Sequence, residues 1–113
     1  MALTINSKTV LRRYDPESKK VLYRLTFDSS YLTGGEELSC VNEFSEIDEV
    51  RVESGQGGYL AIPNSATRAA KYAVGKVDLM LYRQTAATGP LVEVPNATDV
   101  QTTVLNVIVE GRP

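Results

Sequence analysis

The sequence contains no histidine and no tryptophan, and its only cysteine is Cys40. Without histidine, the chain lacks the side chain that most often moves protons near neutral pH and the commonest nitrogen ligand of metals. A Cys–His nucleophile pair is excluded for the same reason. A lone cysteine cannot form a disulfide within the chain, and we expect Cys40 to be a small buried hydrophobic residue. These absences predict a protein that works by surface contact, not an enzyme, without a cofactor or metal.

Length and charge exclude further classes. The 113 residues are 42% apolar and carry a formal net charge of −2, so we expect a single domain over residues 1–113. The weak negative charge predicts no general affinity for nucleic acid or anionic membrane. No apolar run approaches the roughly 20 residues of a membrane helix, and the N-terminus does not resemble a signal peptide. We therefore expect a soluble product of a reducing cytoplasm.

Short runs of alternating apolar and polar residues, separated by Gly, Pro, Asn and Ser, predict strands. Residues 9–14 and 21–27 are expected to form a hairpin around a turn at 15–18. Further strands are predicted at 49–53, 59–62, 76–83, 91–94 and 102–109. The last is expected to be the longest and, because it is apolar on both faces, to be central in a sheet or covered by a partner. The glycines at 55–58 are expected to break the chain between strands.

The predicted fold class is therefore all-β: an antiparallel β-sandwich or a jelly-roll-like small barrel, with long loops and at most one short helix. Residues 66–73 form either that brief helix or the lead-in to a strand. Leu38, Val41 and Phe44 recur every three residues, which indicates a helical turn or an irregular cover over the core. Residues 1–7, in which Leu3 and Ile5 alternate with polar residues, form either an extended N-terminal arm that adds to a neighbouring subunit or a strand of their own sheet.

Charge is unevenly distributed along the chain. Six basic residues lie between positions 8 and 24: Lys8, Arg12, Arg13, Lys19, Lys20 and Arg24. Eight acidic residues lie between positions 28 and 53: Asp28, Glu36, Glu37, Glu43, Glu46, Asp48, Glu49 and Glu53. One interpretation is two solvated faces that keep the monomer soluble. The other is head-to-tail association, with the basic hairpin of one copy against the acidic segment of the next.

The carboxylate pairs do not predict catalysis. Glu36–Glu37 and Asp48–Glu49 are adjacent in sequence, and adjacent residues of a strand point to opposite faces. General acid–base chemistry needs two carboxyl groups that face one cleft. Serines are plentiful, but none lies in a Gly-x-Ser-x-Gly turn. Residues 55–58 lack the Lys-Ser/Thr that follows the glycines of a phosphate loop.

Three segments resemble known proteins. Residues 27–36, Phe-Asp-Ser-Ser-Tyr-Leu-Thr-Gly-Gly-Glu, resemble a Tyr-Pro-Thr-Gly-Gly-Glu loop of small tailed-phage virion proteins. Residues 93–99, Glu-Val-Pro-Asn-Ala-Thr-Asp, resemble the Glu-Val-x-Asn-Gly-Thr-Asp-Leu motif of the same proteins, and residues 47–50 resemble their Ile-Asp-x-Val strand. The segments occur in the expected order. The chain departs from the pattern at Leu32, where proline is common, and at Ala97, where glycine is common.

The resemblance implies a capsid decoration, or cement, protein. Such a protein is an all-β unit, usually a homotrimer, that binds the major capsid protein lattice on the outside of an icosahedral head and stabilises it. It assembles in the bacterial host's cytoplasm and resides on the virion surface. The candidate contact loops are those with the two longer motifs: Tyr31, Thr33, Gly34, Gly35, Glu36, Asn96, Thr98 and Asp99.

Two other functions agree with the same sequence. A head–tail connector or tail structural component is another kind of virion part, for which a ring or hexamer is expected. A small β-sandwich module that binds carbohydrate or a host-surface partner is the other alternative. Flat exposed aromatic residues are typical of sugar-binding faces, and the absence of tryptophan disfavours that alternative.

Overall fold

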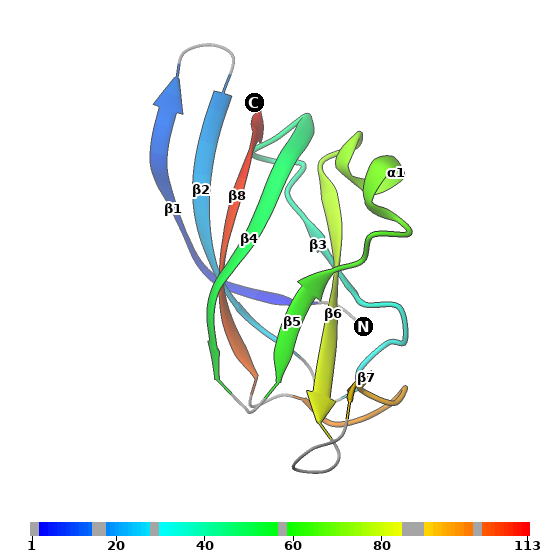
Figure 1. Cartoon of the computed structure of the whole chain (residues 1–113). Coiled ribbons are helices and arrows are strands. Elements are labelled where there is room, and N and C mark those ends of the chain that lie inside the picture. Colours follow the sequence, from blue (N-terminus) through cyan, green and yellow to red (C-terminus); the bar gives the residue numbers. More distant parts are fainter. Residues whose placement is uncertain (1–2, 15–17, 28–29, 57–58, 85–89, 101–102) are drawn as a thin grey trace.

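The fold is an antiparallel β-sandwich with one short helix in the part of the chain that the structure describes, as the computed structural model shows (Figure 1). The described residues are 3–14, 18–27, 30–56, 59–84, 90–100 and 103–113. Sheet A contains, in spatial order, β1 (Thr4–Tyr14), β2 (Ser18–Thr26), β8 (Val104–Arg112) and β4 (Glu46–Gln56). Sheet B contains β3 (Glu36–Ser39), β6 (Lys76–Gln84) and β5 (Leu60–Pro63), and β7 (Leu91–Glu93) also pairs with β6. The helix α1 (Arg68–Tyr72) lies between β5 and β6 in sequence.

The predicted hairpin is confirmed as β1 and β2, with Val10 opposite Val21 and Lys8 opposite Tyr23. The alternation in β2 buries Val21, Tyr23 and Leu25 against sheet B. Because the side-chain period of a strand is two, one face of β2 enters the core while the other stays accessible. The predicted turn falls largely on residues 15–17, which lie outside the described residues.

Two expectations about strand ends are wrong. β4 continues through Gly55 and Gln56, which pair with Leu105 and Val104 of β8, because the neighbouring strand supplies a full ladder of partners there. Residues 57 and 58 lie outside the described residues. The last strand was expected to be the longest, but β8 has nine residues, whereas β1 and β4 have 11 each. The central position predicted for the last strand is confirmed, since β8 lies between β2 and β4.

The segment after the double glycine contains a strand that the sequence pattern did not predict. β3 pairs with β6, with Glu36 opposite Leu79. The residues that recur every three positions, Leu38, Val41 and Phe44, lie in β3 and in the turn that follows it. In this turn the Phe44 amide donates to the Cys40 carbonyl at 2.8 Å. Phe44 is buried in the core, whereas Val41 is 53% exposed. For residues 66–73, the helix is the correct alternative.

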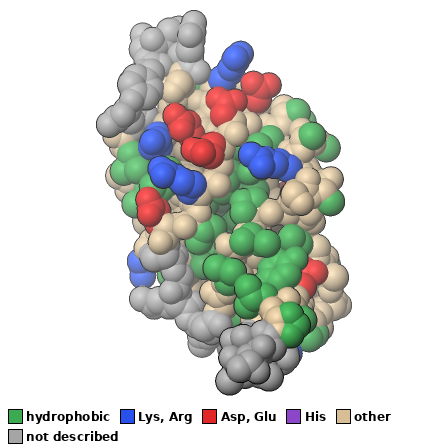
Figure 2. Space-filling view, in the orientation of Figure 1, with side chains coloured by type: hydrophobic (Ala, Val, Ile, Leu, Met, Phe, Trp, Pro, Cys, Tyr) green, Lys and Arg blue, Asp and Glu red, His purple; other side chains and the backbone are tan. Residues whose placement is uncertain are grey.

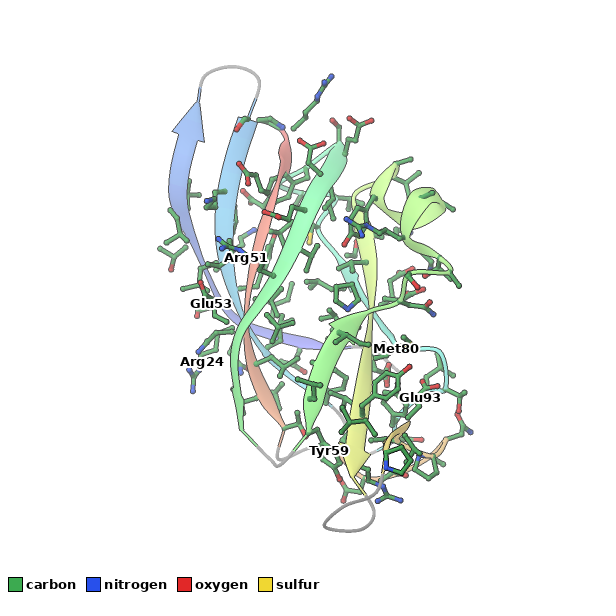
Figure 3. All side chains as sticks on the ribbon, viewed as in Figure 1. Arg24, Arg51, Glu53, Tyr59, Met80 and Glu93 are labelled. Atoms are coloured by element: carbon green, nitrogen blue, oxygen red, sulfur yellow. The ribbon has the colours of Figure 1, made fainter. Side chains whose placement is uncertain are left out.

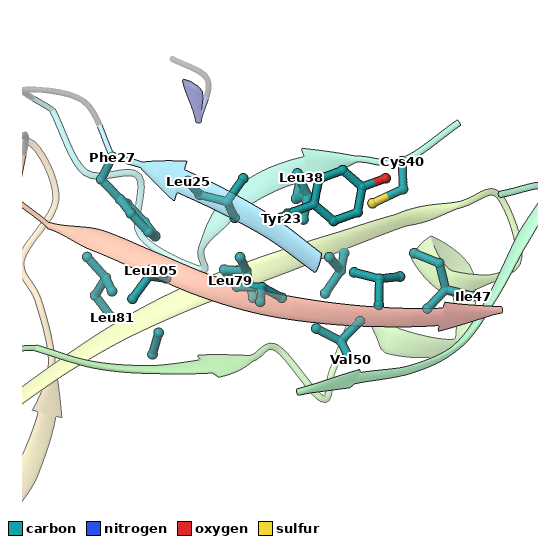
Figure 4. Close-up of a cluster of buried hydrophobic side chains, with 14 of the residues drawn as sticks. Tyr23, Leu25, Phe27, Leu38, Cys40, Ile47, Val50, Leu79, Leu81 and Leu105 are labelled. Carbon is teal, nitrogen blue, oxygen red and sulfur yellow. The ribbon is translucent and has the colours of Figure 1, made fainter. Parts of the chain in front are cut away.

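Inward-facing side chains of both sheets form the core, with aromatic and branched residues such as Tyr23, Phe27, Leu79 and Leu105 in contact across the two layers (Figure 4). Burial of these residues is the main favourable term in folding. Cys40 belongs to this cluster and is 1% exposed, as expected from the sequence. Burial raises the pKa of its thiol to about 11. Cys40 therefore stays protonated at neutral pH and acts as a packing residue.

The N-terminal segment belongs to its own sheet. Residues 4–7 are part of β1, where Ile5 lies opposite Leu25 of β2, so the pairing alternative is confirmed and the free-arm alternative is wrong for these residues. Leu3 is partly buried and packs against the core. Residues 1 and 2 lie outside the described residues. The hydrogen bonds of the ladder explain why these residues remain on β2.

β1 is nevertheless an open edge. Every residue from 4 to 11 is exposed, including Ile5 (43%), Val10 (52%) and Leu11 (46%). Sheet B is narrower than sheet A, and in Figure 1 the C-terminal part of β1 stands clear of it, at the left of the view. An uncovered edge strand with apolar side chains is a site for pairing with another chain.

A cluster of three charged residues connects the β1–β2 hairpin to the turn between β3 and β4 by ion pairs. Lys19 of β2 and Lys8 of β1 both donate to the carboxylate of Glu43, and the Lys8 Nζ–Glu43 Oε2 distance is 2.8 Å. Two hydrogen bonds, the larger effect coming from Lys19 and the smaller from Lys8, lower the pKa of Glu43 from 4.5 to about 2. The ionised form of Glu43 is therefore favoured by folding.

This cluster predicts acid sensitivity. Because the folded pKa of Glu43 is below its ordinary value, its contribution to stability is full above pH 4.5 and is lost as the pH falls from there through about 2. We expect Glu43→Gln to lower the urea midpoint at about pH 7 and to match the wild type at about pH 2. Lys19→Met should remove the same acid-dependent component. An undiminished difference between wild type and Glu43→Gln at low pH would contradict this assignment.

Candidate functional site

The structure brings the two longer motif segments together. The Tyr31 amide donates to the Thr98 carbonyl at 2.8 Å, and the Ala97 amide donates to the Tyr31 carbonyl at 2.7 Å. The Thr33 amide donates to Asn96 Oδ1 at 3.1 Å, across 63 residues of sequence. Residues 31–35 and 93–99 thus form one structural unit, which we call the loop pair. Its shape depends on bonds between the two motifs.

Tyr31 and Glu93 lie at the centre of the loop pair. The buried Tyr31 hydroxyl donates to Glu93 Oε2 at 2.6 Å and accepts from the Leu81 amide at 3.1 Å. The same Glu93 oxygen accepts from the Gly34 amide at 2.7 Å. On β6, Leu81 lies between the residues that pair with β3 and those that pair with β7, so the Tyr31 hydroxyl substitutes there for a strand partner. Burial is the main cause that raises the pKa of Tyr31, and the hydrogen bond to Glu93 is the second. Tyr31 therefore remains a neutral donor.

The double glycine is required by backbone geometry. Gly34 and Gly35 have φ values of 93° and 112°, a region that side-chain-bearing residues rarely adopt. A Cβ on Gly35 would also lie 3.0 Å from the Leu79 carbonyl carbon and oxygen. The Gly-Gly turn therefore allows the loop to reverse directly against β6.

The predicted contact residues divide into two groups by burial. Thr33, Asn96 and Asp99 are exposed, and Gly34 and Thr98 are half-buried, so these five can contact a partner. Tyr31, Gly35 and Glu36 are buried. As contact residues these three are wrong: the Tyr31 hydroxyl is bonded inside the protein, and Gly35 and Glu36 lie against or within the β3–β6 pairing. Their role is to position the loop pair.

A shallow hollow of about 430 Å³ lies beside the loop pair, between the Leu32–Gly35 turn and α1. Lys71 of α1 pairs with Glu37 at 2.6 Å and with Asp78 at 3.6 Å. Thr67 Oγ1 donates to Asp78 Oδ2 at 2.8 Å. The hollow therefore has a floor of charged and polar groups that are bonded to one another.

The electrostatics of the hollow favour polar contact over proton transfer. The hydrogen bond from Lys71 lowers the pKa of Glu37, and the bond to Glu37 raises the pKa of Lys71. Both groups keep their charges at neutral pH, whereas a general acid or base needs a pKa near the working pH. Within the described ranges, no cluster of three or more His, Cys, Asp or Glu residues is arranged to hold a metal ion.

Sequence reasoning included Thr33, Gly34 and Gly35 of the hollow among the candidate contact residues, but it missed Asn64 on the opposite side. Asn64 Nδ2 donates to the Gly34 carbonyl at 2.8 Å, while Asn64 Oδ1 accepts from the Ala66 amide at 2.9 Å. The Pro63-Asn64 pair indicates a turn, and this signal explains the local bond to Ala66. The bond to Gly34 spans 30 residues, and no local pattern predicts it.

Ala97 is the one non-glycine residue with a positive φ, 67°, in the described part of the chain. It occupies the position where the phage motif that this segment resembles commonly has glycine. A left-handed conformation costs a residue with a Cβ about 1–2 kcal/mol. Glycine avoids this cost in the folded state, but its greater conformational entropy in the unfolded chain offsets part of the gain. We expect Ala97→Gly to raise the free energy of unfolding by about 0.5–1 kcal/mol, measured by urea denaturation. Ala66→Gly, in the segment before α1, is the control and should not stabilise the protein.

Comparisons with known proteins gave no match, whether the chain was scanned against family models or searched against curated proteins and solved structures. Among the described residues, no helix has the length and apolar character needed to cross a bilayer. Functional evidence therefore comes from the surfaces and contacts of this chain.

Proposed function

We propose that this protein is a non-enzymatic virion structural protein that binds the outer surface of a tailed-phage capsid and stabilises the head. In this proposal, it acts as a homotrimer on the lattice of major capsid protein. The resemblance of the loop pair to decoration-protein motifs supports the proposal. An uncovered apolar face of sheet B is the single structural observation that supports it best.

This apolar face consists of two neighbouring cross-strand pairs on β5 and β6. Leu60 lies opposite Tyr82, and Ile62 lies opposite Met80. Leu60 and Ile62 are 51% and 38% exposed, and Met80 and Tyr82 are half-buried. Figure 2 shows hydrophobic side chains gathered over β5 and β6, and Figure 3 shows Met80 on this side of the molecule. A contiguous exposed apolar patch is typical of a protein-binding surface.

The apolar face is continuous with the loop pair. Glu93, at the base of the loop pair, lies opposite Tyr82 in the β6–β7 ladder. Leu91 of β7, which lies opposite Gln84 in the same ladder, is 52% exposed and adds to the apolar surface beside Tyr82. One side of the molecule thus combines a flat apolar area with a polar rim, as in many protein interfaces. Repetition of a modest contact by the symmetry of a shell gives strong total binding.

Binding to capsids tests this proposal directly. Purified protein is added to phage heads that lack it, and binding is measured by co-sedimentation, followed by the temperature at which the heads open. We expect Leu60→Lys with Ile62→Lys to weaken binding by about tenfold or more, because lysine charges would be placed on the apolar face. Val74→Lys, at a residue 53% exposed near the end of α1, is the matched control and should bind normally.

Two results would overturn the proposal. One is wild-type protein that binds heads no better than the double lysine variant. The other is heads that open at the same temperature with and without the protein. Binding to tails or connectors in place of heads would favour the alternative virion role.

A further inference from the structure

The hollow beside α1 and the apolar face lie on the same outward side of sheet B. Along β6, every second residue points away from the core, and these residues are Asp78, Met80 and Tyr82. Asp78 lines the hollow, whereas Met80 and Tyr82 belong to the apolar face. Just beyond β5, the Asn64 amide donates to the Asp78 carbonyl at 2.8 Å, so the hollow continues directly from the paired strands. A partner that covers the apolar face would therefore also reach the hollow.

The hollow has an excess of negative charge. Its described lining contains two acidic residues and one basic residue: Glu37, Asp78 and Lys71. Two further charges beside it have opposite signs, namely Glu93 at the base of the loop pair and Lys76, whose Nζ is 3.9 Å from Glu37 Oε2. Because these two offset each other, the surplus carboxylate of the lining favours a cation over an anion.

The Glu37 carboxylate can accept a further hydrogen bond. Lys71 Nζ donates to Glu37 Oε1 at 2.6 Å. The distance of 3.9 Å from Lys76 Nζ to Oε2 is longer than a hydrogen bond. The Glu37 side chain is 39% exposed, so we expect Oε2 to accept from a donor that enters the hollow.

We propose that the hollow binds a cationic side chain, lysine or arginine, of the partner that covers the apolar face. The inference rests on the proposed function for the presence of that partner, and it adds the chemistry that recognises it. Lysine and arginine combine a long apolar stem with a charged end. The stem would lie along Leu32, which is 52% exposed and lines the hollow, and the charged end would reach the Glu37 carboxylate. A contact of this kind discriminates between partners more than it adds affinity.

Small ligands test the inference on the isolated protein. N-acetyl-arginine amide carries the cation, and N-acetyl-citrulline amide has nearly the same shape without the charge. Binding is followed by NMR through the amide signals of Gly34, Gly35 and Thr67, which line the hollow. We expect the arginine ligand to shift these signals with a Kd in the millimolar range, and the citrulline ligand to bind about two- to fivefold more weakly.

Two variants should change the affinity in opposite directions. Glu37→Gln removes the accepting charge and should weaken arginine binding by about two- to fivefold. Lys71→Met removes the resident cation from Glu37 and Asp78, so it should strengthen arginine binding by about the same factor. Damage to the fold would instead weaken binding in both variants. Glu53→Gln, at an exposed acid on the side of sheet A that faces away from sheet B (Figure 3), is the matched control and should bind arginine like wild type.

Equal binding of the arginine and citrulline ligands, or weaker arginine binding by Lys71→Met, would overturn the inference. With phage heads, Glu37→Gln should bind more weakly than wild type. If the arginine ligand binds as expected but heads are not bound, the proposed capsid role fails while the cation site stands. If heads bind Glu37→Gln as tightly as wild type and the two ligands bind equally, the cation site fails while the capsid role stands.

Discussion

Replacing Gly111 by alanine is expected to lower the free energy of unfolding by about 3 kcal/mol. Gly111 lies in β8, where it pairs with Lys19 of β2 on one side and Ile47 of β4 on the other. A Cβ at this position would overlap the Glu46 carbonyl oxygen and lie 2.9 Å from the Ile47 Cα. Both obstacles are backbone atoms, so no side-chain rotation relieves the clash. β4 would have to move away from the central strand of sheet A.

Urea denaturation followed by circular dichroism measures this cost. Gly34→Ala is the matched control, because a Cβ on Gly34 meets nothing within 4 Å. Its φ of 93° leaves only backbone strain, so we expect a loss of about 1 kcal/mol. If the two alanine variants unfolded at the same urea concentration, close packing at Gly111 would not be the reason for glycine there.

The parts of the fold that sequence predicted are those in which local pattern and burial agree. In β2 and β6, apolar residues occur at every second position, and the structure buries that face of each strand against the opposite sheet. The hairpin was predictable because its two strands are neighbours in sequence. The central position of β8 followed from apolar residues on both of its faces.

The parts that sequence did not predict depend on distant partners. β3 is four residues long and contains Glu36 and Glu37, which are poor strand formers. Its strand conformation comes from pairing with β6, about 40 residues away. Gly55 ended the predicted strand because glycine weakens strands locally, yet β8 pairs with it. In both places, tertiary hydrogen bonds override local preference.

The candidate site shows the same division. Motif resemblance located both segments of the loop pair, but it did not indicate that they bond to each other. Tyr31 was assigned to a candidate contact loop because of the motif resemblance. The structure instead uses the Tyr31 hydroxyl to complete the edge of β6. A local sequence window contains no information about the Leu81 amide, 50 residues away, so this role was not predictable.

Tyr31→Phe is therefore expected to lower the free energy of unfolding by about 2 kcal/mol. The substitution keeps the buried ring but leaves the Leu81 amide without its acceptor and removes one donor from Glu93. A buried polar group that loses its partner retains the cost of desolvation. Urea denaturation gives the size of the effect. Amide hydrogen exchange at Leu81 and Gly34 tests its location, since both amides should exchange faster when the network opens.

Two further variants separate the hydroxyl network from general loss of polarity. Tyr82→Phe removes a hydroxyl from a half-buried residue on the outer face of β6 and should change the free energy of unfolding by less than about 0.5 kcal/mol. Glu93→Gln keeps an acceptor for Tyr31 and Gly34 but removes the charge that strengthens both bonds, so its cost should fall between those of the two tyrosine variants. If Tyr31→Phe proved as mild as Tyr82→Phe, the Tyr31 hydroxyl would not hold the loop pair. The exposed contact residues Thr33 and Asn96 would then owe their positions to the backbone bonds between the two segments.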